Sequence, residues 1–261
     1  MPYTLIDAGV NLTNSQFNDE HQPIIARANE AGVKNMLIIG CDISSSEQSL
    51  ELAKKYQQYA TAGIHPHDAK SATDSLEIHL TKLTTDNHVV AIGECGLDYN
   101  RDFSPRDIQR CVFRRQLKLA ERLNLPVYLH ERDASEDMFK ILSEFNVRGV
   151  LHCFTGNKDA LTRYLKLGLY IGITGWVCDE RRGQELQTLM PSIPLNRLLI
   201  ETDAPFLIPR TVKPKPKSRK NEPALLPYVC QMLAQLYDVD ESVIAKQTTE
   251  NFYTLFGIES Q

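Results

Sequence analysis

The chain has 261 residues, of which 42% are hydrophobic and 24% are charged, as in an ordinary globular protein and unlike a disordered one. Its net charge of −4 gives no overall attraction for nucleic acid or membrane, so any anion binding has to be local. No apolar stretch approaches the roughly 18 residues that a membrane helix needs. The 6 cysteines include no C-x-x-C pair, which favours reduced thiols and a cytoplasmic location over disulfides.

Short apolar runs alternate with amphipathic stretches such as residues 107–123, where apolar side chains recur at helical spacing. Strands that alternate with helices indicate a parallel sheet. Eight such units predict an α/β fold, a closed (β/α)8 TIM barrel in one domain over residues 1–261, with further helices at 223–237 and 240–256. An open doubly wound sheet is the alternative, because periodicity does not show closure. The predicted strands are residues 4–7, 35–39, 60–64, 89–93, 126–129, 149–152, 169–173 and 197–200.

Glu94 stands out in the stretch VVAIGECGLDY, because an apolar run leads directly into an acid flanked by glycine. A carboxylate is rarely buried unless it is paired or bound to a metal. In a barrel, the carboxyl ends of the strands meet at one face and carry the catalytic side chains. Other predicted strands place potential metal ligands at the same face, namely His65, His130, His152, Glu201 and Asp203.

Each of these residues has an ordinary structural explanation when taken alone. A histidine at a strand end is often structural, Glu94 could accept backbone hydrogen bonds, and Glu201 could pair with Arg132. Together, however, imidazole nitrogens and carboxylate oxygens are what a divalent ion binds, and a catalytic ion keeps one position open for water. The set therefore predicts a site for a divalent metal ion.

Residues 209–223 break the alternation with a proline-rich basic segment, PRTVKPKPKSRKNEP, which we expect to be an extended loop. It is either a solvated loop or an arm that contacts phosphates, and Lys217, Arg219 and Asn221 are candidate substrate-binding residues. Arg132 is a fourth, because a guanidinium can grip phosphate, although it could instead pair with Asp133 or Glu201. Aromatic residues that follow strand ends could stack on unpaired bases or pack in the core: Tyr99, Phe103, Phe154, Trp176 and Phe206.

The motifs GIHPH, GECGLDY, HERDA, LHCFTG and ETDAP, in this order, closely resemble the TatD family of metal-dependent deoxyribonucleases. The resemblance implies an amidohydrolase-type barrel and phosphodiester hydrolysis with a divalent metal, usually on DNA and in some members as a 3′→5′ exonuclease on single strands. It makes Glu94, His130 and His152 metal ligands and Asp203 the acid that binds metal or the attacking water. His65 matches a pocket histidine that could protonate the leaving oxygen. We take Asp203, Glu201 and His65 as candidate catalytic residues.

The sequence departs from the family at the first strand, where many members carry a D-x-H-x-H motif. Here Asp7 is followed by Gly9 and Asn11 at the two histidine positions, as in a known subset of the family. Glycine offers no ligand atom and asparagine only a neutral oxygen. We therefore expect one well-held ion, or a second that arrives only with substrate. The mixed ligand set favours Mg²⁺, with Mn²⁺ or Zn²⁺ as alternatives.

The predicted function is thus Mg²⁺-dependent 3′→5′ exonuclease action on single-stranded DNA, or RNA, in DNA repair or turnover, by a chain expected to be monomeric. Two other classes of function stay open at this point. One is a hydrolase of small amides, esters or lactones, or of aminoacyl-tRNA, because the fold does not determine the substrate. The other is a barrel without catalysis that binds nucleic acid.

Overall fold

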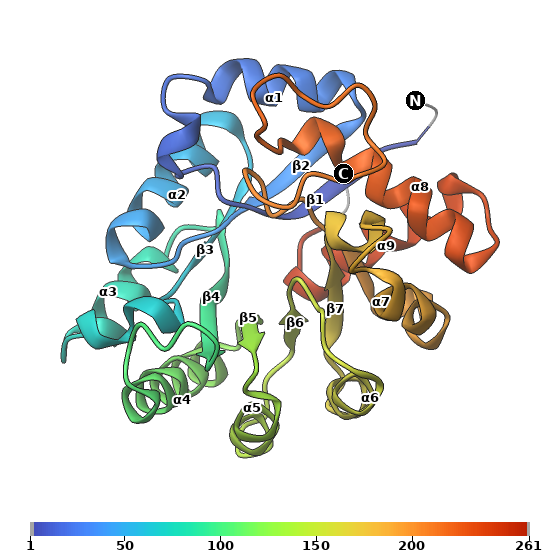
Figure 1. Cartoon of the computed structure of the whole chain (residues 1–261). Helices are drawn as coiled ribbons and strands as arrows, with labels where there is room; N and C mark the ends of the chain where they lie inside the picture. Colours follow the sequence, from blue (N-terminus) through green and yellow to red (C-terminus); the bar gives the residue numbers. More distant parts are fainter. Residues whose placement is uncertain (1–2, 260–261) are drawn as a thin grey trace.

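The computed structural model describes residues 3–259, so the extreme ends of the predicted domain 1–261 lie outside it. Eight parallel strands form one sheet in the order β1 to β8, and helices lie between them on the outside, which confirms the predicted (β/α)8 barrel (Figure 1). Every predicted strand overlaps an observed one. The strands are β1 (Leu5–Val10), β2 (Val33–Ile38), β3 (Tyr59–Ala62), β4 (Val89–Asp98), β5 (Val127–Arg132), β6 (Gly149–Leu151), β7 (Tyr170–Ile173) and β8 (Leu198–Ile200).

Nine α-helices lie in the part of the chain that the structure describes, and α4 corresponds closely to the predicted helix 107–123. No helix there is long and apolar enough to cross a membrane. The α-helices are α1 (His21–Glu30), α2 (Ile43–Tyr56), α3 (Leu76–Leu83), α4 (Arg106–Leu123), α5 (Ser135–Leu142), α6 (Lys158–Lys166), α7 (Gln184–Leu189), α8 (Leu226–Tyr237) and α9 (Glu241–Phe256). The 3-10 helices are η1 (Ser15–Phe17), η2 (Pro66–Ser71), η3 (Gly175–Cys178), η4 (Met190–Ser192), η5 (Leu195–Arg197) and η6 (Pro223–Leu225).

The barrel closes through the segment that follows β8 rather than through a full ladder between β8 and β1. The Asn11 N–H donates to the Ala204 carbonyl at 2.9 Å, and the Asp203 N–H donates to the Gly9 carbonyl at 2.9 Å. The buried Asp7 carboxylate accepts hydrogen bonds from the Thr202 backbone N–H at 2.8 Å and from its hydroxyl at 2.5 Å. These contacts fix Asp203 beside the end of β1.

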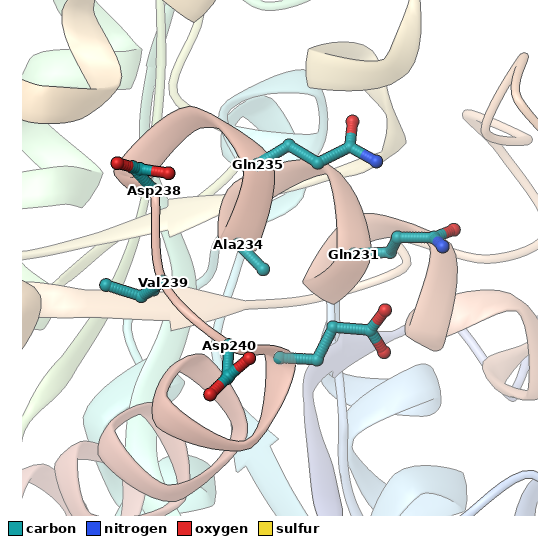
Figure 2. A pocket seen from close by; sticks show the side chains of 7 residues that line it. Gln231, Ala234, Gln235, Asp238, Val239 and Asp240 are labelled. Atoms are coloured by element: carbon teal, nitrogen blue, oxygen red, sulfur yellow. The ribbon is translucent and has the colours of Figure 1, made fainter.

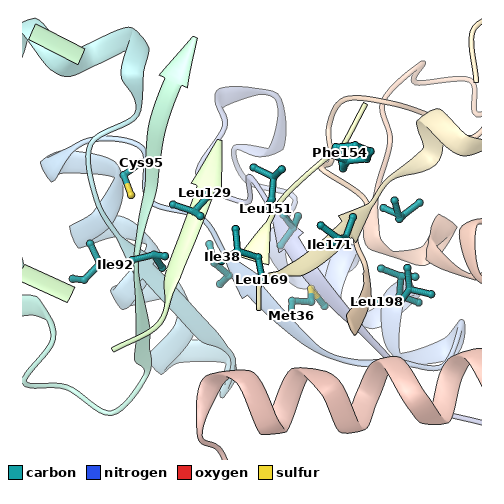
Figure 3. Packing of buried hydrophobic residues seen from close by; sticks show 14 of the residues in the cluster. Met36, Ile38, Ile92, Cys95, Leu129, Leu151, Phe154, Leu169, Ile171 and Leu198 are labelled. Atoms are coloured by element: carbon teal, nitrogen blue, oxygen red, sulfur yellow. The ribbon is translucent and has the colours of Figure 1, made fainter. Parts of the chain in front are cut away.

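Two layers of apolar side chains form the core, because successive residues of a strand point to opposite faces of the sheet. One layer packs between the strands and the surrounding helices, and Figure 3 shows part of it, including Ile38, Ile92 and Leu129. The other comes from alternate strand positions such as Leu37 and Val90 and packs with α9 residues, including Phe252. A packed interior leaves the carboxyl end of the barrel as the place for a site.

The strand β4 is longer than predicted, and the expectation that it ends at Glu94 is wrong. It continues to Asp98 and pairs with β5, with Gly96 opposite His130. Two glycines permit this close approach: a Cβ at Gly93 (φ +147°) would lie 2.3 Å from the Tyr128 carbonyl oxygen, and one at Gly96 (φ +148°) would lie 1.9 Å from that of His130. Glu94 consequently lies inside a buried strand.

Candidate metal centre

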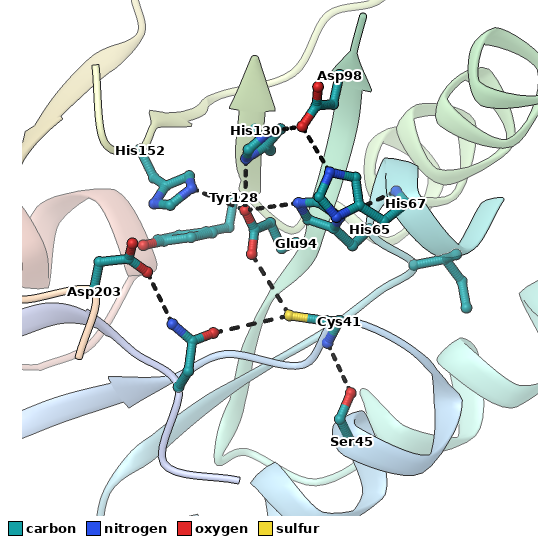
Figure 4. Close-up of polar contacts among 12 residues, drawn as sticks. Cys41, Ser45, His65, His67, Glu94, Asp98, Tyr128, His130, His152 and Asp203 are labelled. Carbon is teal, nitrogen blue, oxygen red and sulfur yellow. Dashed lines mark hydrogen bonds and ion pairs between the residues drawn. The ribbon is translucent and has the colours of Figure 1, made fainter. Parts of the chain in front are cut away.

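The predicted ligands converge at the carboxyl end of the barrel, where different elements hold them (Figure 4). Glu94 lies in β4 and His130 in β5, whereas His152 directly follows β6. His65 follows β3 and caps η2, where its Nδ1 accepts a hydrogen bond from the His67 N–H at 3.1 Å. The site therefore rests on adjacent strands, which hold its side chains more rigidly than loops would.

The Glu94 carboxylate is the centre of the cluster, since one of its oxygens faces three imidazoles. Glu94 Oε1 lies 2.8 Å from His152 Nε2, 3.1 Å from His130 Nδ1 and 3.5 Å from His65 Nε2. The ligand atoms of His65, Glu94 and His130 all lie within 4.8 Å of one another. The neighbouring oxygen, Oε2, faces the Cys41 thiol at 3.6 Å.

The charges in this cluster depend strongly on one another. Burial pushes the pKa of the Glu94 carboxyl upward, but the surrounding imidazoles, His152 above all, outweigh it and hold that pKa well below its usual range. For His152 burial acts in the opposite direction, and the Glu94 and Glu201 carboxylates raise the pKa of the imidazole well above its ordinary value. Burial lowers the pKa of His65 to about 3, so this ring is neutral at pH 7. A neutral imidazole beside an ionised carboxylate is suited to metal binding.

Each of two central histidines has a carboxylate behind it, and this arrangement fits a divalent ion. His130 Nε2 approaches Asp98 at 3.4 Å, and His152 Nδ1 approaches Glu201 at 3.5 Å. Both nitrogens are buried and lack a hydrogen bond within the described residues. Histidines that bind metals commonly direct their second nitrogen at a carboxylate, which fixes the ring and its tautomer. These residues therefore fit the divalent metal ion that the sequence predicts.

Glu201, a predicted catalytic residue, is fully buried behind His152. Its Oε1 accepts a hydrogen bond from the Cys153 N–H at 2.5 Å, and its Oε2 accepts one from the Tyr128 hydroxyl at 2.6 Å. It forms no ion pair with Arg132 in the described chain. These contacts hold the Glu201 carboxylate next to the His152 ring.

Tyr128 occupies the space beside Gly9, the residue at the first histidine position of the D-x-H-x-H motif. A Cβ at Gly9 would lie 2.0 Å from the Tyr128 hydroxyl oxygen and 2.8 Å from Glu201 Oε2. Asn11, at the second position, donates a hydrogen bond from its amide to Asp203 Oδ1 at 2.8 Å. Burial raises the pKa of the Asp203 carboxyl to about 7, although His152 opposes this shift.

Three residues of the cluster were not among the predicted site residues: Asp98, His67 and Cys41. Asp98 Oδ2 lies 2.7 Å from His67 Nε2, so this carboxylate joins His67 to His130. Asp98 lies five residues beyond the predicted strand 89–93, so the sequence did not indicate that its side chain reaches the cluster. The motif GIHPH did contain His67, but spacing alone did not show which of its histidines turns inward.

The predicted substrate-binding residues fall into two groups. Arg132, Lys217 and Arg219 are exposed, and none of them forms an ion pair with a residue between 3 and 259. Asn221, in contrast, is 0% exposed and donates its amide hydrogens to the Thr202 carbonyl at 2.9 Å and to the Phe206 carbonyl at 2.6 Å. Asn221 therefore anchors the end of the basic loop and is not placed to contact a substrate.

A cavity of about 560 Å³ lies elsewhere, between α8 and α9, and is lined by Gln231, Asp238, Asp240 and Glu241, among others (Figure 2). Tyr3, directly before β1, donates a hydrogen bond to Glu241, which places the start of α9 at the amino end of the barrel. The cavity is thus at the opposite end from the histidine cluster and is not part of it.

Known proteins are similar to this chain in sequence and in fold. The family model "TatD related DNase" matches residues 6–257. A protein of Escherichia fergusonii named "3'-5' ssDNA/RNA exonuclease TatD" is 48% identical over 97% of this chain and 99% of its own length. One of the same name from Klebsiella pneumoniae is 47% identical over 98% of each chain. The structure of the Escherichia coli TatD homologue YJJV superposes with a TM-score of 0.89 at 29% identity and covers 98% of both chains.

The match to the family model spans nearly the whole chain and includes every strand that carries a ligand of the cluster. The likeness to YJJV extends the agreement to the barrel itself. The chain belongs to the family of TatD-related DNases.

Proposed function

We propose that this protein is a Mg²⁺-dependent 3′→5′ exonuclease that acts on single-stranded DNA or RNA. The observation that carries the proposal is the group of three histidines around the buried Glu94 carboxylate, in a chain that is 47–48% identical to relatives named for this activity. A divalent metal follows from the family and from the donor set, whereas Mg²⁺ is our choice among the possible ions. Mn²⁺ and Zn²⁺ are outcomes of the test below.

In this proposal, Glu94, His130 and His152 hold the ion, with His65 as a further ligand in place of the proton donor predicted from sequence. When bound, such an ion lowers the pKa of its water and offsets negative charge on a phosphate. The structure supports the ligand role of His65, because its ring is buried and neutral and faces Glu94.

The chain's own residues supply the remaining parts. The Asp203 carboxyl, with its pKa near 7, is suited to orient the attacking water and to accept its proton. Asn11 holds Asp203 in place from the end of β1. Arg132, exposed at the end of β5, is placed to stabilise the charge that develops on the phosphate.

The basic loop supplies the local positive charge that a chain of net charge −4 needs in order to bind nucleic acid. Arg210 and Lys220 pair with Glu180 and Glu20 near the ends of the loop. Between them, Lys213, Lys215, Lys217 and Arg219 are exposed and form no ion pair with any residue that the structure describes. We infer that these four contact the phosphate backbone.

We also propose a cytoplasmic role in DNA repair or turnover. All 6 cysteines are free thiols, which accords with a reducing compartment.

The test is the digestion of 5′-labelled single-stranded DNA, duplex DNA and RNA in EDTA, Mg²⁺, Mn²⁺ or Zn²⁺. The wild type is compared with His152→Ala and with His79→Ala, which makes the same change at an exposed histidine of α3. We expect a ladder of shortened products that requires Mg²⁺, disappears in His152→Ala and persists in His79→Ala.

If the ladder appears with Mn²⁺ or Zn²⁺ but not with Mg²⁺, the exonuclease proposal stands and the proposed metal is wrong. Cleavage at internal positions would overturn the exonuclease assignment. No cleavage with any ion would overturn the proposal, and p-nitrophenyl esters, amides and lactones would then be the next substrates.

A further inference from the structure

The exposed ring of Phe103 lies beside the metal centre and is the feature from which we infer a further site. Phe103 is in the loop between β4 and α4 and is 56% exposed. Its ring contacts His67 edge to face, with centroids 4.8 Å apart, and the His67 ring lies 4.3 Å from that of His65. One ring thus separates Phe103 from a candidate metal ligand.

A single exposed apolar side chain is ordinary on a protein surface, so exposure alone carries no argument. What distinguishes Phe103 is how firmly its backbone is held. The Lys70 ammonium donates to the Phe103 carbonyl at 3.0 Å. The next residue, Ser104, donates its hydroxyl to the His67 carbonyl at 2.7 Å, and the Gln109 amide donates to the Ser104 carbonyl at 2.8 Å. These hydrogen bonds hold the loop backbone in place, and the ring rests against His67.

The other aromatic residues that follow strand ends differ from Phe103. Phe154 is buried at 3% exposure. The Tyr99 and Trp176 rings are covered by the guanidinium groups of Arg106 and Arg182, each at 4.4 Å. Phe206 is 47% exposed, but no aromatic contact within residues 3–259 joins it to the histidines.

Two arginines lie on the segments next to Phe103, one in its own loop and one at the end of the neighbouring strand. Arg101 is exposed in the same loop as Phe103. Arg132 is the last residue of the neighbouring strand β5, where its backbone lies opposite that of Asp98 in β4. Neither guanidinium forms an ion pair within the described part of the chain. An exposed aromatic ring together with unpaired guanidinium groups can bind single-stranded nucleic acid. The ring stacks on a base, because every base has a π face, and the guanidinium groups contact phosphates.

We propose that Phe103 is the stacking platform of a nucleobase subsite. It would hold one unpaired base of the substrate beside the metal ligands, with Arg101 and Arg132 on the flanking phosphates. This inference rests on the proposed nuclease function and adds to it a reason for acting on single strands. In the interior of a duplex, both faces of a base are covered by its neighbours, so such a base cannot stack on Phe103 until it is freed.

The experiment measures kcat/KM on 5′-labelled single-stranded oligonucleotides, either intact or with one tetrahydrofuran abasic residue at each of the three 3′-terminal positions in turn. The enzymes are the wild type, Phe103→Ala, Phe103→Trp, and Val243→Ala as the control. Val243 is an exposed apolar residue near the start of α9, at the amino end of the barrel.

On intact DNA we expect Phe103→Ala to reduce kcat/KM by about 5- to 160-fold, which corresponds to the roughly 1–3 kcal/mol typical for the loss of one stacked base. Phe103→Trp should retain most of the activity, and Val243→Ala should match the wild type. At one of the three abasic positions, the kcat/KM of the wild type should fall by a similar factor relative to intact DNA. On that abasic substrate, Phe103→Ala should have nearly the same kcat/KM as the wild type.

That non-additivity is the decisive result, since a damaged loop would reduce kcat/KM equally for every substrate. An equal loss by Phe103→Ala on intact DNA and on all three abasic substrates would overturn the subsite, as would an unchanged kcat/KM on intact DNA. A wild type that cleaves no DNA or RNA would overturn the nuclease proposal instead, so the two failures are distinguishable.

Discussion

His152 Nε2 lies 2.8 Å from Glu94 Oε1, and each side chain is only 7% exposed. This contact joins the end of β6 to the middle of β4 across the intervening strand β5. A buried carboxylate with three imidazoles around one oxygen has too many partners for an ordinary ion pair. Glu94 and these imidazoles are the residues that would hold a divalent ion, which binds histidine in its neutral form.

Glu94→Gln should abolish metal-dependent nuclease activity. The amide has the shape of the carboxylate but lacks the charge that a divalent ion requires. We expect kcat/KM to fall by more than about 100-fold, the upper range for the loss of a residue that merely supports a ligand. Glu144→Gln is the matched control, because this exposed glutamate pairs with Arg114 away from the cluster. Full activity of Glu94→Gln would refute the metal assignment.

Adding Mg²⁺ should stabilise the wild type, and EDTA should reverse the effect. An ion at 100 times its Kd adds about 2.7 kcal/mol to the free energy of unfolding, which a thermal melt detects. The shift should be absent in His152→Ala and present in His79→Ala. Titration calorimetry should give one ion per chain without substrate, since Tyr128 fills the space beside Gly9. A stoichiometry of two would contradict this.

Lys217→Ala and Arg219→Ala should weaken the binding of single-stranded DNA and reduce its salt dependence. Each lost phosphate contact lowers the slope of log K against log salt by about 0.7, so the double variant should lose about 1.4. Fluorescence anisotropy at several salt concentrations measures this slope. Lys246→Ala, at a lysine of α9 that is 77% exposed, is the control. An unchanged slope in the double variant would remove the loop from the binding surface.

Asn221→Ala should destabilise the fold rather than remove a substrate contact. It leaves the buried Thr202 carbonyl and the partly buried Phe206 carbonyl without the donors on Asn221, at a cost of about 1–3 kcal/mol in the free energy of unfolding. Urea denaturation measures the change, with the exposed Asn146→Ala as the comparison. A variant of wild-type stability that has lost only DNA affinity would restore Asn221 as a substrate-binding residue.

Asp7→Asn should change how stability depends on pH. Burial raises the pKa of the Asp7 carboxyl to about 7 from 3.8, although hydrogen bonds from Thr202 and the Gly9 N–H oppose the shift. Because the folded pKa lies above the unfolded one, this group's contribution is fully present below about pH 4 and is lost as the pH rises toward 7.

The free energy of unfolding of the wild type, minus that of Asp7→Asn, should therefore decrease by up to about 4 kcal/mol between pH 4 and pH 7. Urea denaturation at a series of pH values measures the difference. The decisive quantity is its slope, since the amide also changes the absolute stability. A difference that stays constant over this range would show that the pKa of Asp7 is not raised.

The amino-acid sequence predicted eight β/α units, because short apolar runs alternate with helical patterns such as residues 107–123, but periodicity left the closure of the sheet open. It also placed Glu94, His130 and His152 at one face, since parallel strands in a βαβ chain all point the same way. Neither inference required a contact between particular side chains.

The burial and the contacts of the residues around this cluster could be read only from the folded chain. Glu201 and Asn221 look from sequence like accessible polar residues, yet their packing turns them into buried anchors. Asp98 joins the cluster because β4 continues past Glu94. Phe103 lies beside it because the loop after β4 returns to His67. The physical reason is that periodicity reports which face a residue occupies, whereas distance, burial and hydrogen-bond partners depend on segments far apart in the chain.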